Sequence, residues 1–346
     1  MKARKRFSAS ISSFSFYVFL VLTFLTFLLM ISCNENPAAP ELQSEQYFDS
    51  SLLGYRSYIH SSIPAFGLDA NPINALQNRA LIYWYNITPS DVRAIDILGK
   101  ANSDYEQVKV LDLVFNPSKK GIYTNGELSQ DMKTNWGGVF RALPDSIIKK
   151  FGKSNLVMKI WLRIEDAGDD AVLNIDLGKI SEDIIPNGRL DTEDKNSNDL
   201  LDEGEDTGID GIFDMEEPGY NNGDDPDNDD FNFAAGHYEK VNGLEKNGLY
   251  GGYKIPDTED LNRNFTLDKT NNYFSYLVPL DMEKILATKI TEAGGNGWIQ
   301  LKIPIDLPDL RVGAPDKSKI ETMRLWITNT DQPVYIRIAQ IKFEEI

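Results

Sequence analysis

The chain has almost no sulfur or imidazole chemistry, since its 346 residues include one cysteine, Cys33, and two histidines, His60 and His237. A single cysteine excludes an internal disulfide, so the fold must be stabilised by its core or by bound ions. Neither histidine lies beside a nucleophile motif, and the sequence contains no G-x-S-x-G, H-E-x-x-H or P-loop. We therefore expect a protein that is not an enzyme, although counting alone leaves a glycosidase pair of carboxylates open.

Positive charge is also scarce: 35 Lys and Arg residues face 53 Asp and Glu residues, which gives a formal net charge of −18. The segment Ser181–Asp230 alone holds 19 acidic and two basic residues, and so accounts for nearly the whole excess. Such a block repels itself unless it is disordered or neutralised by cations. Because no basic patch compensates for it, nucleic acid is excluded as a partner.

A twelve-residue phrase occurs twice, as DTEDKNSNDLLD at Asp191–Asp202 and as DTEDLNRNFTLD at Asp257–Asp268. Oxygen-bearing residues at alternate positions are the ligand pattern of an EF-hand calcium loop. Asp199 stands where the sharp turn favours Gly, but Asp tolerates a left-handed backbone. The ligands expected of the first copy are Asp194, Asn196, Asn198, the Leu200 carbonyl, Asp202 and Glu205.

The second copy is less complete, because Phe265 stands at the turn and Asn271 replaces the bidentate Glu. We expect it to bind Ca²⁺ more weakly or to serve as a structural turn. Neither copy is flanked by amphipathic helices, which favours a calcium loop of an extracellular β-protein; a solvated acidic loop without an ion is the alternative. The ligands expected of the second copy are Asp260, Asn262, Asn264, Thr266 and Asp268.

Further acidic residues in the block form clusters that we expect to be solvated rather than ligating. They are Asp210, Asp214, Glu216 and Glu217, and the alternating Asp225, Asp227 and Asp229.

Strand signals are strong and helix signals are poor. Short apolar or alternating runs separated by Gly, Pro, Asn and Asp predict an all-β sandwich of the jelly-roll or galactose-binding-like kind, with a few short helices. The expected strands are Ala80–Ile87, Glu106–Phe115, Leu156–Glu165, Ala171–Ile180, Tyr273–Leu280, Trp298–Ile305, Thr322–Asn329 and Val334–Phe343. The expected helices are Ser90–Leu98, Ser146–Phe151 and Leu280–Glu292.

The acidic block divides this series of strands, so residues 181–271 are predicted to be an insertion that carries both calcium loops. The insertion is dense in turn-forming residues and cannot bury a core of its own. The domain that contains it is expected to span residues 47–346.

The N-terminus has the pattern of a processing signal, with basic residues followed by the apolar run Phe14–Ile31. A small residue directly before Cys33 resembles a bacterial lipoprotein signal, which implies residues 1–33 as the signal, lipidation of Cys33, and residues 34–46 as a tether. The implied location is the outer membrane, with the domain facing the periplasm or the cell surface. An uncleaved membrane anchor is the alternative.

Several phrases together resemble the large surface protein SprA (also called Sov) of gliding and type IX-secreting bacteria. They keep the family's order from about Tyr47 to the C-terminus. Examples are ALIYWYNITPSDVR at Ala80–Arg93, NWGGVFRALP at Asn135–Pro144, LNIDLGKISEDIIPNGRLDTED at Leu173–Asp194 and VYIRIAQIKF at Val334–Phe343. SprA is several times longer, so the resemblance implies one soluble SprA domain and not its translocation channel.

The resemblance implies protein–protein contact within a secretion or gliding apparatus. The alternative is a carbohydrate-binding module with a structural Ca²⁺. For the latter, Trp136, which lies in a glycine turn, is the best candidate for an exposed contact, but even there we favour core or loop packing. Trp161 and Trp326 lie inside strands and are expected in the core.

Overall fold

The computed structural model describes residues 48–66, 68, 72–87, 90–100, 106–124, 126–288 and 290–346. The expected signal, the lipidation site Cys33 and the tether lie outside these residues. Among the described helices, none has the length and apolar character needed to span a bilayer.

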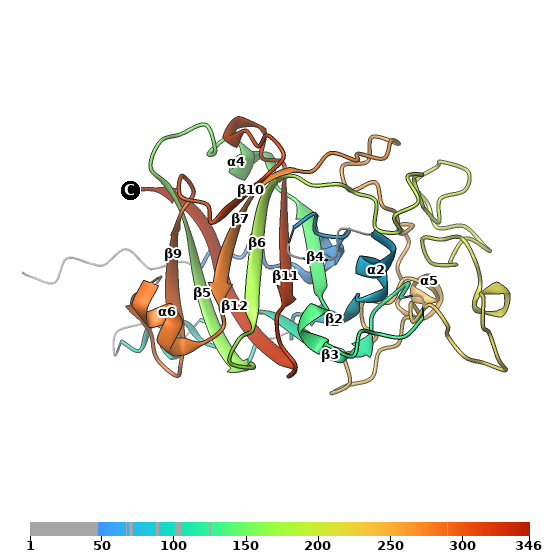
Figure 1. Cartoon of the computed structure of the whole chain (residues 1–346), viewed down its shortest axis with the longest axis horizontal. Helices are drawn as coiled ribbons and strands as arrows, with labels where there is room; N and C mark the ends of the chain where they lie inside the picture. Colours follow the sequence, from blue (N-terminus) through green and yellow to red (C-terminus); the bar gives the residue numbers. More distant parts are fainter. Residues whose placement is uncertain are drawn as a thin grey trace, which may run out of the picture. The chain divides into compact units, whose positions relative to one another are not determined.

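The described strands form two six-stranded sheets in which all hydrogen-bonded neighbours are antiparallel (Figure 1). The predicted β-sandwich is therefore confirmed. The first sheet has the order β1 (Ile59–His60), β4 (Gly137–Ala142), β11 (Thr322–Thr328), β6 (Val172–Lys179), β7 (Asn272–Pro279) and β10 (Leu310–Val312). The second has the order β2 (Ala80–Tyr85), β3 (Leu111–Lys120), β12 (Val334–Glu345), β5 (Leu156–Asp166), β9 (Ile299–Pro304) and β8 (Ile290–Ala293).

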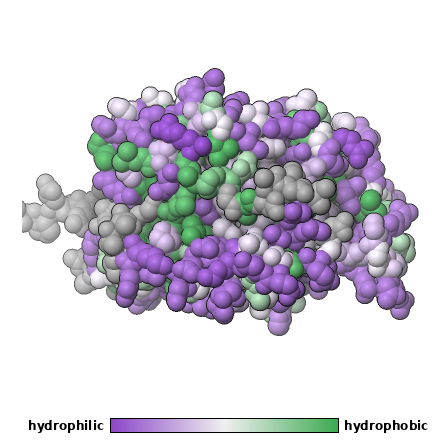
Figure 2. Space-filling model, viewed as in Figure 1, coloured by the Kyte–Doolittle hydropathy of each residue, from purple (hydrophilic) through white to green (hydrophobic). Residues whose placement is uncertain are grey.

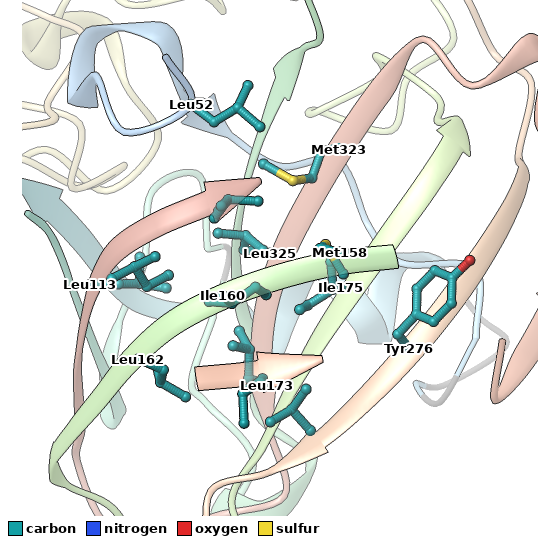
Figure 3. Packing of buried hydrophobic residues seen from close by; sticks show 14 of the residues in the cluster. Leu52, Leu113, Met158, Ile160, Leu162, Leu173, Ile175, Tyr276, Met323 and Leu325 are labelled. Atoms are coloured by element: carbon teal, nitrogen blue, oxygen red, sulfur yellow. The ribbon is translucent and has the colours of Figure 1, made fainter. Parts of the chain in front are cut away.

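The main core lies between the two sheets, where alternate residues of each strand point inward. Figure 3 shows Leu173, Ile175 and Leu325 of the first sheet packed with Leu113 and other residues of the second. At about 25 cal/mol per Å² of apolar surface removed from water, this interface is the main source of stability for a chain without disulfides.

Strand β5 is covered on both faces. Met158, Ile160 and Leu162 face the main core, as the alternation predicts. On the opposite face Trp161 is fully buried in a second apolar cluster with Trp298. Trp326 is also buried, and its indole N–H donates to Asp176, so the expectation that Trp161 and Trp326 are packed is confirmed.

Strand β3 extends past the expected stop at Asn116-Pro117. Between β2 and β3 the pairing jumps from Leu81↔Asn116 to Ala80↔Lys120, which marks a bulge. Pro117 lies in this bulge, where its missing N–H interrupts no ladder hydrogen bond.

The helices are short, and the one expected at Leu280–Glu292 is the most altered. It becomes α6 (Met282–Thr288), and the chain from Ile290 pairs with Leu301 of β9. The β-branched residues Ile290 and Thr291 favour this strand over a longer helix. The remaining helical elements are α2 (Pro72–Gln77), α3 (Ala94–Leu98), α4 (Asp145–Ile148), α5 (Asn247–Tyr250), η1 (Tyr55–Ser57), η2 (Met132–Thr134), η3 (Asp214–Glu216) and η4 (Lys317–Lys319).

The acidic segment 181–271 leaves β6 and returns on its hydrogen-bonded neighbour β7, where Lys179 pairs with Asn272. Figure 1 shows its irregular chain, which includes α5, gathered beside α2 at one end of the sandwich. An apolar cluster fixes it there, because Ile184 and Ile209 pack with Phe140 and Tyr273 of the first sheet. In the view of Figure 2, hydrophilic residues cover most of the described surface.

Candidate metal centres in the acidic insertion

The first predicted loop, Asp194–Glu205, turns around the carboxylate of Asp194. The backbone N–H groups of Asn198 and Asp199 donate to its two oxygens at 3.0 and 2.9 Å. Asp199 has a φ of +60°, so the left-handed turn expected at the sixth position is present. The chain therefore follows the tight path that the ligand spacing predicts.

The opposite side of this loop is held by Asp202 and Glu205. The amide groups of Asn196 and Asn198 both donate to Asp202 Oδ2, at 2.8 and 2.9 Å. Glu205, only 6% exposed, accepts the N–H groups of Lys195 at 3.2 Å and Asp202 at 2.9 Å. The predicted side-chain ligands of the first loop thus lie close together. Glu205 joins the two ends of the loop, because it binds the backbone at the second position, Lys195, and at the ninth, Asp202.

The second predicted loop repeats these contacts. The N–H groups of Asn264 and Phe265 donate to the two oxygens of Asp260, at 2.9 and 2.5 Å. The amide of Asn262 donates to Asp268 Oδ2 at 2.8 Å, as Asn196 does to its own aspartate.

The residues at the seventh position of each loop, Leu200 and Thr266, also make equivalent backbone hydrogen bonds. Their N–H groups donate to the side-chain oxygens of Asn198 and Asn264, both at 2.8 Å. Phe265 has a φ of +61°, close to that of its counterpart in the first loop. The two copies therefore share one backbone conformation.

The carboxylate that the second copy lacks in sequence is supplied by Glu182. Its two oxygens accept the N–H groups of Leu261 at 3.0 Å and Asp268 at 3.1 Å, the same two positions that Glu205 binds in the first loop. Asn271, at the expected ligand position, instead accepts the N–H of Ser181 at 3.1 Å. The second loop therefore has a carboxylate at the positions that Glu205 binds in the first, and it comes from another part of the chain.

The two copies also pair with each other through a short antiparallel bridge between Thr192 and Thr258. The glutamates that follow these threonines are fully buried and accept backbone N–H groups. Glu259 accepts those of Ile185 and Asp191, at 2.8 and 3.1 Å, and its counterpart Glu193 accepts that of Asp257 at 2.8 Å. The repeated phrase thus builds one connected unit.

The electrostatics of this unit are dominated by buried negative charge. Burial, opposed by backbone hydrogen bonds, raises the pKa of Glu182 to about 7 and that of Glu259 to about 8. Burial and then the nearby charge of Asp257 raise the pKa of Glu193 above its usual range. A bound cation would favour the ionised form of these groups, so the segment has the chemistry of a hard-cation site.

The other predicted contact residue, Trp136, is fully buried. Its indole N–H donates to the Ala75 carbonyl at 2.7 Å, and the Arg79 guanidinium lies 5.3 Å from the ring centre. Trp136 is thus packed, as the favoured expectation had it, and its ring is not available as an exposed ligand contact.

The comparison with protein families concerns the end of the insertion and the strands that follow it. Residues 235–344 match a family model, SprA_N, described as a motility related/secretion protein. This part of the chain is therefore similar to the SprA family. The match supports the resemblance found in the sequence phrases, and the residues that it covers include strands β7 to β11 and most of β12. A comparison with curated proteins gives no match.

Two solved structures share a weak similarity with the chain. One is the structure of PfGH50B, with 9% identity and a TM-score of 0.23; the alignment covers 78% of this chain and 23% of that protein. The other is a carbohydrate-binding module specific for non-crystalline cellulose, CBM28, with 9% identity and a TM-score of 0.25, and coverage of 75% and 86%. This chain thus spans less than a quarter of PfGH50B, and scores this low establish no shared site.

Proposed function

We propose that this protein acts without catalysis, by protein–protein contact, in the motility or secretion apparatus of the cell envelope. The observation that carries the proposal is the match of residues 235–344 to a motility related/secretion family. The lipoprotein-like N-terminus supports an outer-membrane anchor at Cys33, with the domain facing the periplasm or the cell surface. In this proposal the acidic segment is a Ca²⁺-stabilised part of the domain rather than a calcium sensor, because β-strands and not helices flank it.

A gene deletion in the source bacterium tests the role. Loss of surface motility or of type IX export, restored by the wild-type gene, is the expected result. Complementation with Cys33→Ser examines the anchor separately: the protein should leave the membrane fraction and restore function poorly. A deletion strain with normal motility and normal export would disprove the proposed role.

A second candidate function is glycan binding, favoured by a cavity of about 520 Å³ where the sandwich meets the insertion. Tyr55 and Tyr253 line it, and the Arg56 guanidinium lies 4.8 Å from the Tyr253 ring centre. Aromatic faces beside a polar group are suited to a small polar ligand. Glycan-array binding that is lost in Tyr253→Ala and kept in the exposed-tyrosine control Tyr250→Ala would support this candidate; an array without binding would exclude it.

A further inference from the structure

A group of four carboxylates lies in the insertion outside both repeated loops. Asp214, Glu217, Asp229 and Glu245 each place one oxygen so that all four oxygens lie within 4.8 Å of one another. Two oxygens on opposite sides of a Ca²⁺ ion, each bound at about 2.4 Å, are about 4.8 Å apart. The group therefore has the dimensions of a single coordination sphere.

Burial distinguishes this group from an ordinary acidic surface. Asp229 is 0% exposed, Glu245 2% and Glu217 4%. Within the described residues, Asp214 Oδ1, Glu217 Oε1 and Asp229 Oδ1 are buried and accept no hydrogen bond. A buried carboxylate oxygen without a partner loses its hydration without compensation, and a cation is the partner that can supply it.

The remaining oxygens of the group are held in place. Glu217 Oε2 accepts the N–H of Asp227 at 3.0 Å, and Asp229 Oδ2 accepts the hydroxyl of Tyr123 at 2.7 Å. Glu245 Oε2 accepts the N–H of Asp214 at 3.3 Å. Hydrogen bonds of this kind orient the ligands of a metal site, because in Glu217 and Asp229 one oxygen is fixed and the other is free for the ion.

The local charge leaves room for a divalent cation. Lys246 is the basic side chain in contact with the group, and it is shared among Asp214, Asp230 at 2.6 Å and Glu245 at 3.5 Å. One ammonium cannot balance four carboxylates, and it lies beside the group without contacting Glu217 or Asp229 in the described structure. Hard oxygen ligands without nitrogen or sulfur select Ca²⁺ over the transition metals.

We propose that Asp214, Glu217, Asp229 and Glu245 bind a Ca²⁺ ion at a site separate from the two repeated loops. Its position gives it a structural effect, because Asp229 is hydrogen-bonded to Tyr123 in the β3–β4 connection. The ion would therefore fix three stretches of the insertion to the sandwich. This site does not depend on the proposed role in motility or secretion.

The test is the number of Ca²⁺ ions bound by the full chain in detergent, measured by calorimetry after removal of metal with EDTA. Glu217→Gln should bind one Ca²⁺ fewer than wild type, and the control Glu216→Gln, which removes an exposed charge next to it, should bind the wild-type number. Glu205→Gln should lose one ion at the first loop, and the double variant with Glu217→Gln should lose two. An unchanged number of ions in Glu217→Gln would overturn the proposal.

Thermal melting separates a loss of Ca²⁺ binding from a loss of stability in Glu217→Gln. In EDTA, Glu217→Gln should melt no lower than wild type, because it removes one of four mutually repelling carboxylates, and added Ca²⁺ should raise its Tm by less. A lower Tm in EDTA together with an unchanged Ca²⁺-dependent rise would show that Glu217 only supports the fold. Mg²⁺ that binds this site as tightly as Ca²⁺ would overturn the choice of ion.

Discussion

At the scale of single residues, the insertion is organised by glutamates that bind backbone N–H groups. Glu205 and Glu182 each satisfy two such donors, which would otherwise lack partners inside a loop-rich segment. Glu205 is predictable because it stands at the twelfth position of its loop. Glu182 is not, because it precedes Leu261 by 79 residues and no local spacing connects them.

The role of Glu182 predicts the effect of Glu182→Gln. The glutamine side chain has only one acceptor oxygen, so its NH₂ group must face the N–H of either Leu261 or Asp268. One of the two hydrogen bonds is then replaced by a repulsive contact between two donors. Urea unfolding in EDTA should show a loss of about 1–3 kcal/mol. The exposed control Glu203→Gln should change stability by less than about 0.5 kcal/mol. Equal effects of the two variants would contradict the assigned role.

His60 is a second residue whose environment makes a prediction. It is 6% exposed, its ring lies 4.8 Å from that of Trp84, and its Nε2 donates to the Asn242 carbonyl at 3.0 Å. Burial, with a smaller effect from Arg79, lowers its pKa to about 3. Between pH 3 and 6.5 the unfolded chain therefore binds a proton at this residue that the folded chain does not, and stability falls as the pH falls.

From pH 7.5 to pH 5.0 this one group should reduce the free energy of unfolding by about 2 kcal/mol. In His60→Gln, whose amide can still donate to Asn242, that part of the pH dependence should disappear. Urea unfolding of both proteins at the two pH values measures the difference. A pH dependence identical to wild type would show that His60 is protonated in the folded state.

At the scale of elements, the strands are largely predictable and their exceptions have local causes. Residues with clear alternation, such as Leu156–Glu165, become strands with the expected core face. Strand β4 is missed, because its sequence begins with Gly137 and Gly138, which have low strand propensity. Both glycines are required by packing, since a Cβ on Gly138 would lie 2.8 Å from Trp326 Cβ.

Gly137 therefore predicts a matched pair of variants. A Cβ at this position would lie 2.8 Å from Phe115 Cδ2 and 2.9 Å from Ile82 Cβ, both in the core. Gly137→Ala should lower stability by about 1–3 kcal/mol through overpacking. The control Gly152→Ala, whose Cβ would meet nothing within 4 Å, should leave it almost unchanged. Thermal or urea unfolding distinguishes them, and a neutral Gly137→Ala would contradict the packing described for β4.

At the scale of the whole molecule, most of the negative charge lies in one segment, and some of its carboxylates are buried and help to hold that segment in place. The formal net charge is −18, most of it in residues 181–271, for which the sequence predicts an insertion without a core of its own. What the sequence does not indicate is how the segment is held: Ile184 and Ile209 pack on the first sheet, and buried carboxylates join its turns. These contacts depend on the folding of distant segments, which no local pattern encodes.

Removal of metal should therefore destabilise the whole domain. With Ca²⁺ at 100 times its dissociation constant, each native-state site contributes about 2.7 kcal/mol by mass action. We expect EDTA to lower the Tm and excess Ca²⁺ to restore it, in a melting experiment at constant ionic strength. A Tm that EDTA leaves unchanged would contradict the Ca²⁺ assignment of Asp194–Glu205.

The pairing of Lys179 with Asn272 has a consequence for how this chain can vary. Adjacent antiparallel strands lie about 4.8 Å apart, so both ends of the insertion stand at the spacing that a two-residue hairpin also spans. Relatives could lengthen, shorten or exchange this segment while the strand order of the sandwich stays the same. The length and sequence of the acidic segment can therefore change between relatives without a change in the strand order of the sandwich.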